Sequence, residues 1–355
     1  MNRAATVALT PLSSLYGLAM KTRRALYRSG LLRIRELGAP VISVGNLTTG
    51  GTGKTPLVEW IARELARKKQ RVCILTRGYG RAQPKQRVVV SDGNRILANP
   101  KQAGDEPFLL AERLLGQAAV ISDANRASAA RWALDNLQSN VFLLDDGFQN
   151  LRIARSLNIV TLDATNPWGN RGLLPAGILR EPRAELSRAD CVVITRADDT
   201  TRIDELAREI EKLNDARPVF RSHMTISGVR PVCAQVKDSK PAIRAEEIKS
   251  SSVAAFCAIG NPQAFFAQLR RDGYQLYNTK TFRDHHLYTQ SNIDSIVRES
   301  MANGAQILLT TAKDEVKLRS LAFALPCYAM DIAIDIEDKD KLITLIDEAL
   351  EQSDR

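Results

Sequence analysis

A glycine-rich segment, TTGGTGKT, is the first feature of this 355-residue chain whose residue types and spacing predict chemistry. It stands between an apolar run and an amphipathic stretch, the strand–loop–helix context of a phosphate-binding loop. Backbone N–H groups of such a turn point at phosphate oxygens, and the next helix presents its positive end. The segment therefore predicts binding of a nucleoside triphosphate. Its ATP-binding residues are Thr48, Thr49, Gly50, Gly51, Thr52, Gly53, Lys54 and Thr55.

Two residues of this loop have separate expected roles. Lys54 reaches the β and γ phosphates, and Thr55 offers its hydroxyl to Mg²⁺. The loop departs from the usual pattern at its first position, where Thr48 replaces glycine. The alternative, a glycine-rich turn that binds nothing, is disfavoured by the flanking strand and helix.

A pair of carboxylates ends the run VFLLDDGFQ, in which four apolar residues precede Asp145 and Asp146. A buried strand that ends in aspartate beside a phosphate-binding loop is how such proteins hold the Mg²⁺ of the nucleotide. The alternative is that these acids cap a turn. Agreement among strand, acidic pair and loop favours the metal-side role.

A second acidic pair, Asp105 and Glu106 in GDEP, opens a predicted helix. Asp105 is either an N-cap or the carboxylate that accepts a proton from an attacking hydroxyl. Two of the three histidines are adjacent in FRDHH, at His285 and His286. A histidine on a turn is usually solvated and idle, but one carried by a second domain can meet a carboxylate when a cleft closes.

The elements that position these residues alternate along the chain from Val41 onward. Short apolar runs at 41–45, 71–76, 88–92, 118–123, 141–146, 158–163 and 191–198 predict strands, and segments such as 56–70 predict helices. The 56–70 helix is expected to bury Leu57, Val58, Ile61, Ala62 and Leu65. Near-continuous apolar strands separated by helices predict a parallel sheet covered on both faces. The expected fold class is α/β, a doubly wound P-loop NTPase sheet with ligands at the carboxyl ends of its strands.

A change of texture after residue 218 predicts a second, smaller α/β domain. Residues 219–250 are polar and look irregular, with the linker near 220–230. Strands at 253–260 and 307–311 and a helix at 262–273 follow, and a final helix at about 339–351 could pack on either domain. The expected organisation is an N-terminal segment at 1–40, the P-loop domain at 41–222 and the smaller domain at 223–355.

The N-terminal 40 residues hold much of the formal charge of +10, with seven basic residues against Glu36. Clustering of cations beside apolar residues favours a membrane surface over nucleic acid. No run is long enough to span a bilayer, and the order of apolar and basic parts is not that of a signal peptide. At helical period, one side is expected to be apolar and the other basic. The apolar side has Leu12, Leu15, Tyr16, Ala19, Met20, Leu26 and Tyr27, and the basic side has Lys21, Arg24 and Arg28. The segment is either an interfacial helix or an ordinary amphipathic helix packed on its own domain.

The five cysteines form no C-x-x-C pair and are widely spaced. This pattern predicts small core residues in a reducing compartment, with neither a disulfide framework nor a zinc site. The cysteines are Cys73, Cys191, Cys233, Cys257 and Cys327.

Seven segments in order, GNLTTGGTGKTP, TRGYG, GDEP, DDGFQN, NPWGNRGLLPAGILREP, FRDHH and ILLTTAKD, resemble the tetraacyldisaccharide 4′-kinases, the lipid A 4′-kinase family. The similarity spans nearly the whole chain. It implies an ATP- and Mg²⁺-dependent kinase, peripheral on the cytoplasmic face of the inner membrane. Such an enzyme phosphorylates the 4′-hydroxyl of a tetraacylated glucosamine disaccharide 1-phosphate, a lipid substrate in lipid A biosynthesis.

The resemblance also implies roles for individual residues. Asp105 and His285 correspond to a catalytic pair. The metal side corresponds to Thr55, Asp145, Asp146, Glu106 and Gln149. The segment that faces the substrate contributes Asn170, Arg171, Arg180 and Glu181.

Two other classes of protein share parts of this pattern. The variant loop is similar to that of partitioning ATPases, which act as nucleotide switches on membranes, but those carry a second lysine where this chain has Thr49. A kinase for a soluble metabolite is the other alternative, and it leaves the basic amphipathic N-terminus unexplained.

Overall fold

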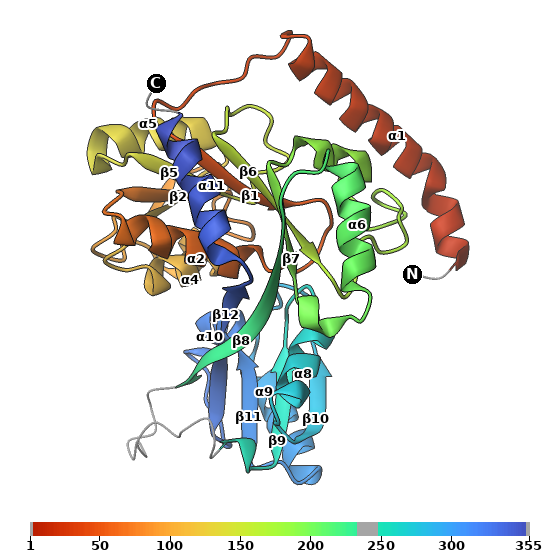
Figure 1. Ribbon diagram of the computed structural model, residues 1–355. Helices are drawn as coiled ribbons and strands as arrows, with labels where there is room; N and C mark the ends of the chain where they lie inside the picture. The colour runs from red at the N-terminus through yellow and green to blue at the C-terminus, as the bar shows by residue number, and fades with distance from the viewer. Residues whose placement is uncertain (1–2, 233–247, 353–355) are drawn as a thin grey trace. The chain divides into compact units, whose positions relative to one another are not determined.

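The computed structural model describes residues 3–232 and 248–352, with side chains from residue 8 onward. The chain forms two compact units (Figure 1). Unit 1 contains Met1–His223 and Ile334–Arg355, and unit 2 contains Met224–Ala333. The chain passes from one unit to the other on strand β8 (Val219–Pro231) and returns on strand β12 (Cys327–Ile336).

The sheet of unit 1 has the strand order β8-β7-β6-β1-β5-β2-β4-β3. Its strands are β1 (Val41–Asn46), β2 (Val72–Thr76), β3 (Val88–Ser91), β4 (Ala118–Ser122), β5 (Val141–Asp145), β6 (Leu157–Asp163) and β7 (Cys191–Thr195). All pairs from β8 to β4 are parallel, and the edge strand β3 pairs antiparallel with β4. The register places Val44 of β1 beside Asp145 of β5, so both strands end at the same edge.

Helices cover both faces of this sheet (Figure 1). On one face, α5 (Arg126–Leu137) and α6 (Ile203–Leu213) pack on strand residues that include Phe142 and Val160. On the other, α2 (Lys54–Arg67) packs on β1, β2 and β5. Its buried residues are Leu57, Val58, Ile61, Ala62 and Leu65, which confirms the expected inward face. Because helices bury both faces of the sheet, its central strands need apolar side chains on both sides, which is the pattern seen in the sequence. The expected doubly wound α/β arrangement is confirmed.

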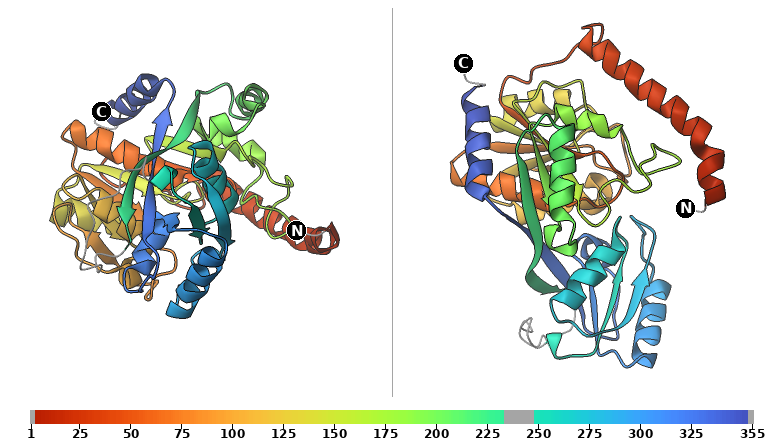
Figure 2. Two further views of the ribbon diagram at one scale, coloured as in Figure 1. Left: turned by 90° about the horizontal axis from the view of Figure 1, so that it is seen from below. Right: turned by 45° about the vertical axis from the view of Figure 1, so that its right-hand side comes forward.

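The remaining elements of unit 1 are shorter or lie near the chain ends. Between β3 and β4 the chain forms α3 (Pro100–Ala103) and α4 (Asp105–Arg113), and on either side of β7 it forms the 3-10 helices η1 (Arg183–Arg188) and η2 (Ala197–Asp199). The final helix, α11 (Lys339–Glu351), belongs to unit 1, where Asp347 forms an ion pair with Lys68 at the end of α2. Figure 2 shows α11 running along unit 1 in both views.

Unit 2 has its own sheet of parallel strands in the order β10-β9-β11-β12. The strands β9 (Val253–Cys257), β10 (Leu276–Thr281) and β11 (Ile307–Thr311) alternate with α8 (Pro262–Arg271), α9 (Gln290–Ala302) and α10 (Ala312–Leu318). Phe256 and Leu308 face α9, whereas Ala255 and Leu309 face α8. The unit therefore has a core on each side of its sheet.

The prediction of an irregular segment at 219–250 is wrong over its first part. Residues Val219–Pro231 form the 13-residue strand β8. Buried Phe220, Ser222 and Met224 alternate there with half-buried Arg221 and His223. That alternation is the pattern of a half-buried strand, and its polar members made the segment look irregular. The linker expected near 220–230 falls within β8, and residues 233–247 of the expected irregular segment lie outside the described residues.

Helix α1 (Arg3–Arg28) continues without a break through Pro11 (Figures 1 and 2). Of the apolar side expected from the sequence, Tyr27 is buried, but Leu12 and Leu15 are 53% and 64% exposed. Ser13, Tyr16 and Arg24 instead hold the helix on unit 1 by polar contacts. The expected apolar side is therefore exposed at Leu12 and Leu15, as the interfacial alternative requires, whereas Arg24 of the expected basic side lies on the packed face.

The four described cysteines are buried free thiols, as expected, and Cys233 lies outside the described residues. No helix among the described residues is both long enough and apolar enough to cross a membrane.

Candidate active site

The phosphate-binding loop leaves β1 after Asn46 and enters α2 at Lys54. Gly50 and Gly53 have φ values of 107° and 77°, which L side chains adopt only at a cost. Glycine at these positions lets the backbone turn and direct N–H groups toward the start of α2. A loop of this shape, followed by a helix N-terminus, is a site for phosphate groups.

Residues outside the motif fix the loop. Thr52 is buried, and its Oγ1 accepts a hydrogen bond from Asn46 Nδ2 at 3.0 Å and lies 2.8 Å from Thr161 Oγ1. The Thr195 hydroxyl donates to the backbone carbonyl of Thr52 at 3.1 Å. At the variant start of the loop, the Thr49 N–H donates to the carbonyl of Ile178 at 2.8 Å. Asn46, Thr161 and Thr195 were not predicted from the sequence, because their only signal is a polar residue at or near the end of a strand.

Asp145 and Asp146 lie at the end of β5 beside this loop, as the strand order predicts. Lys54 Nζ is 3.6 Å from Asp146 Oδ1. Both carboxylate oxygens of Asp146 accept hydrogen bonds from Arg180 at 2.8 Å. Asp146 also has a φ of 52°, so its backbone is held in the left-handed region. These contacts bring Lys54, Asp146 and Arg180 together, whereas the turn-capping alternative does not account for them.

The electrostatics of the two aspartates differ. Burial, with Glu106 and Asp146 nearby, raises the pKa of Asp145 to about 6. Burial also raises the pKa of Asp146, but the charges of Lys54 and Arg180 outweigh it and lower that pKa overall. Asp145 is therefore a carboxylate whose negative charge is not fully balanced by the protein.

This acidic group fits a magnesium ion by its chemistry. Mg²⁺ prefers carboxylate oxygens, takes one or two of them from the protein and completes its shell with water and phosphate oxygens. No group of three His, Cys, Asp or Glu residues placed to hold a metal occurs in the described part of the chain. Asp145 with Glu106 nearby is thus suited to a nucleotide-bound Mg²⁺, not to a cage made by protein alone.

Arg126 orders the backbone beneath these acids. It is buried at the start of α5, and its guanidinium donates to the carbonyl oxygen of Asp145 at 2.9 Å. Burial lowers the pKa of Arg126, and the charges of Asp145 and Asp146 oppose that shift. No motif pointed to this residue, because its role depends on the packing of α5 against β5.

Gln149 lies next to the metal-side pair. Its side-chain Nε2 donates to the backbone carbonyl of Asn46 at 2.8 Å, and its backbone carbonyl oxygen accepts from Arg23 of α1 at 3.0 Å. Arg180 is 3.5 Å from Gln149 Oε1. Gln149 thus joins the end of β1, helix α1 and Arg180.

The segment expected to face the substrate divides into two parts. Arg180 contacts Asp146, and Glu181 is buried in an ion pair with Arg188. Burial raises the pKa of Glu181 against the attraction of Arg188. Asn170, in contrast, bonds within its own segment, donating to the Ala176 carbonyl and accepting from the Gly172 N–H. Arg171 is exposed and lies 4.0 Å from Glu209 of α6.

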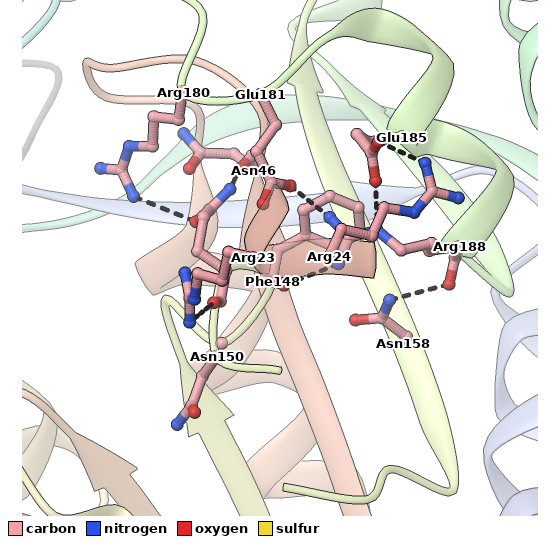
Figure 3. Close-up of polar contacts among 12 residues, drawn as sticks. Arg23, Arg24, Asn46, Phe148, Asn150, Asn158, Arg180, Glu181, Glu185 and Arg188 are labelled. Atoms are coloured by element: carbon pink, nitrogen blue, oxygen red, sulfur yellow. Dashed lines mark hydrogen bonds and ion pairs between the residues drawn. The ribbon is translucent and has the colours of Figure 1, made fainter. Parts of the chain in front are cut away.

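Helix α1 meets this segment through charged side chains. Figure 3 shows Arg24 of α1 and Arg188 of η1 both directed at Glu185, and Arg188 also reaches Glu181. The Tyr16 hydroxyl donates to the Arg180 carbonyl at 2.8 Å. The basic N-terminal helix is therefore joined by hydrogen bonds and ion pairs to the residues beside the phosphate-binding loop.

The two residues of the expected catalytic pair lie in different units. Asp105 is the first residue of α4, where Gly104, with a φ of 92°, occupies the N-cap. The N-cap alternative for Asp105 is thus wrong. His285 follows β10 in unit 2, has a φ of 60° and is partly buried. The adjacent His286 stacks on Phe282 and contacts Asn292 at 2.9 Å, so it supports the turn.

A doubly wound sheet with a phosphate-binding loop and an acidic strand end at the same edge defines a P-loop nucleotide-binding protein. Comparison with known proteins identifies the family within this class. The family described as tetraacyldisaccharide-1-P 4′-kinase matches residues 5–351, and this chain belongs to that family.

Relatives with the same description cover nearly all of the chain. A tetraacyldisaccharide 4′-kinase of Desulfotalea psychrophila is 41% identical over 90% of both chains. Another from Geobacter metallireducens is 38% identical over 99% of this chain and 100% of the relative. A crystal structure of LpxK from Aquifex aeolicus in complex with ATP has a TM-score of 0.75 and 32% identity, covering 98% of this chain and 99% of that one.

Proposed function

We propose that this protein transfers the γ-phosphate of ATP to the 4′-hydroxyl of a tetraacyl glucosamine disaccharide 1-phosphate, a step of lipid A biosynthesis. The observation that carries the proposal is the convergence of Lys54, Asp145 and Asp146 in a chain that belongs to the 4′-kinase family over nearly its whole length. The family supplies the acceptor, and the geometry supplies the means to bind and neutralise a triphosphate.

The phosphate side of the reaction falls to unit 1. Backbone N–H groups of residues 48–53 hold the phosphates, and Lys54 neutralises charge that builds up on the γ-phosphate during transfer. Thr55, Asp145, Asp146, Glu106 and Gln149 are the proposed metal-side group. Mg²⁺, when bound there, neutralises charge on the β and γ phosphates. The three donors of Lys54 serve both Asp146 and a phosphate, and Arg180 also balances that carboxylate.

The acceptor side needs a base. We assign Asp105 as the carboxylate that accepts the proton of the 4′-hydroxyl, and His285 as its catalytic partner. Membership of the 4′-kinase family supports this assignment, and Asp105 stands at the first residue of α4, after the N-cap Gly104. The left-handed backbone at His285 supports it as well, since such strain persists where the surrounding structure requires it.

Four residues are proposed to bind the sugar or its phosphates. Arg180 and Glu181 lie beside the metal-side group and are the stronger candidates. Asn170 and Arg171 remain proposals, Arg171 as an exposed cation and Asn170 as the residue that shapes the loop.

An acylated substrate stays in the membrane, so the enzyme must work at its surface. We propose a peripheral position on the cytoplasmic face of the inner membrane, where ATP is present. Leu12, Leu15 and Leu18 are exposed on α1, at 53%, 64% and 62%, and supply an apolar surface for the lipid boundary. Exposed Lys21 and Arg28 on the same helix can meet anionic headgroups.

The function is tested with labelled ATP and detergent-dispersed tetraacyl disaccharide 1-phosphate. We expect label to appear in the lipid at the 4′ position, and Lys54→Met to lower kcat about 100-fold or more because an electrostatic contact in the transition state is lost. Lys68→Met, which removes the surface partner of Asp347, is the matched control and should keep wild-type activity. Slow ATP hydrolysis with no labelled lipid would instead indicate a nucleotide switch.

A further inference from the structure

In unit 2, two charged residues, Asp284 and Lys313, surround His285 and have not yet been given a role. Lys313, the second residue of α10, places Nζ 3.2 Å from Asp284 Oδ1 and 3.4 Å from His285 Nε2. Asp284 Oδ1 in turn accepts a hydrogen bond from the His285 N–H at 3.0 Å. The lysine therefore contacts both the imidazole and the carboxylate that holds the backbone of the same turn.

The backbone that carries Lys313 is fixed by buried polar contacts. Thr311 caps α10, and its hydroxyl donates to Asp314 Oδ2 at 2.7 Å. The same carboxylate oxygen accepts from the Ala258 N–H, just after β9, at 3.0 Å. Asp314 is fully buried and also pairs with Lys317 at 3.0 Å. Lys313 thus projects from a rigid helix start, with only 15% of its side chain exposed.

The turn that carries His285 is anchored from its other side. His286 stacks on Phe282 with ring centroids 4.7 Å apart, and it also meets Tyr288 edge-on. This anchor fixes the backbone of the turn that carries the neighbouring His285. The two adjacent histidines therefore have different tasks: His286 packs against aromatic rings, and His285 lies beside Lys313.

The chemistry of lysine decides which nitrogen of His285 carries the proton. An ammonium group has three donors and no acceptor, so His285 Nε2 must accept in this contact. A neutral imidazole that accepts at Nε2 carries its hydrogen on Nδ1. The Nδ1–H is then the ring donor available to a carboxylate, the arrangement in which a histidine and an acid form a functional pair.

We propose that Lys313 is a positioning residue for phosphoryl transfer, which holds the His285 ring in its Nδ1–H tautomer and in the orientation that an acid partner requires. The inference rests on the proposed function, and specifically on the role of His285. Lys313 acts through the imidazole and touches neither nucleotide nor acceptor.

The tautomer is measured without turnover by ¹⁵N NMR of histidine-labelled protein. The chain has only three histidines, so His285 is assigned by the signal that disappears in His285→Ala. We expect the Nδ1–H pattern in the wild type and its loss in Lys313→Met. Lys280→Met is the matched control, since Lys280 pairs with Glu299 on α9 and should leave the signal unchanged.

Kinetics then test the consequence. Lys313→Met should lower kcat about tenfold, as loss of a partner that orients a functional histidine does, with KM for ATP and lipid little changed. Lys313→Arg should restore part of the rate. In a His285→Ala background, Lys313→Met should cost nothing further, because residues that act as one unit are not additive.

Three results would overturn the proposal. One is an unchanged His285 spectrum in Lys313→Met. Another is an equal loss of kcat with and without His285, which would show that Lys313 acts on a phosphate directly. The third is full activity of Lys313→Met in a preparation where His285→Ala is impaired. Failure of the proposed function looks different, because the wild-type protein itself then transfers no label to lipid.

Discussion

At the scale of single residues, the site depends on a close approach between two backbones. A Cβ added to Gly45 would lie 2.5 Å from both the backbone nitrogen and the Cβ of Phe148. Gly45 precedes the phosphate-binding loop, and Phe148 lies between Asp146 and Gln149. The two halves of the nucleotide site therefore meet where only glycine fits.

This contact gives a stability prediction. Gly45→Ala should lower the free energy of unfolding by about 1–3 kcal/mol, the usual cost of overpacking a core. It should also raise the Mg²⁺ concentration needed for half-maximal activity, because a shift of Phe148 is expected to displace Asp146, two residues earlier in the same turn. Urea unfolding and a Mg²⁺ titration measure the two effects. Gly228→Ala is the control, since its added Cβ meets its nearest atom, Asp331 Oδ2, at 3.5 Å. A wild-type denaturation curve for Gly45→Ala would contradict the argument.

At the scale of elements, helix α1 separates two kinds of contact. Its polar residues Ser13, Tyr16 and Arg24 hold it on unit 1. Three of its leucines, Leu12, Leu15 and Leu18, remain in solvent. An ordinary amphipathic helix does the reverse and buries its leucines. A helix docked by its polar side is available for an apolar boundary without leaving the protein.

Replacement of Leu12, Leu15 and Leu18 by serine should therefore weaken binding to anionic vesicles roughly tenfold or more, because about 1.5–3 kcal/mol is gained for each leucine fully buried. Vesicle co-sedimentation measures the change. The melting temperature should stay the same, since these side chains are exposed in the free protein. Activity on detergent-dispersed substrate should also persist. Leu97→Ser, at another exposed leucine of unit 1, is the control, and equal binding by both variants would rule out α1 as the membrane contact.

At the scale of the whole molecule, the chain leaves unit 1 at His223 and re-enters it at Ile334. His223 Nε2 lies 2.8 Å from Glu337, just after the returning strand, and Nδ1 lies 3.3 Å from Asp198 of η2. The Glu337 N–H also donates to the Arg221 carbonyl at 2.9 Å. These contacts join the outgoing and returning strands within unit 1.

The contacts of His223 predict a pH-dependent stability. Burial lowers its pKa, but the hydrogen bonds and charges of Glu337 and Asp198 outweigh it and raise the pKa above the ordinary value of 6.5. A raised folded-state pKa stabilises the fold fully below pH 6.5, and this contribution is lost as pH rises through the folded value. Denaturant unfolding from pH 5.5 to 8.5 should therefore show His223→Gln least stable relative to wild type at the acidic end. A constant difference across that range would show that charge is not involved.

Much of the architecture could be predicted from local pattern. The bounds of β11 and α11 and the inward face of α2 follow from apolar periodicity, because burial on a helix or strand selects residues at fixed spacing. The strand β8 could not be recognised in the same way. Polar residues of β8, such as His223, pair with side chains of other segments, at Asp198 and Glu337, and the sequence pattern does not reveal those pairs.

The sequence by itself determined that a triphosphate loop and an acidic strand end belong to one parallel sheet. The spacing of the glycines, Lys54 and Asp145 relative to the apolar runs is enough to identify both features. Only the tertiary structure decided which face of α1 packs, that Arg126, Arg180 and Gly45 shape the acidic site, and that Lys313 lies beside His285. The physical reason is the distance along the chain between the residues that interact. Periodicity and loop chemistry act between neighbours in sequence, whereas ion pairs and steric contacts join residues that only folding brings together.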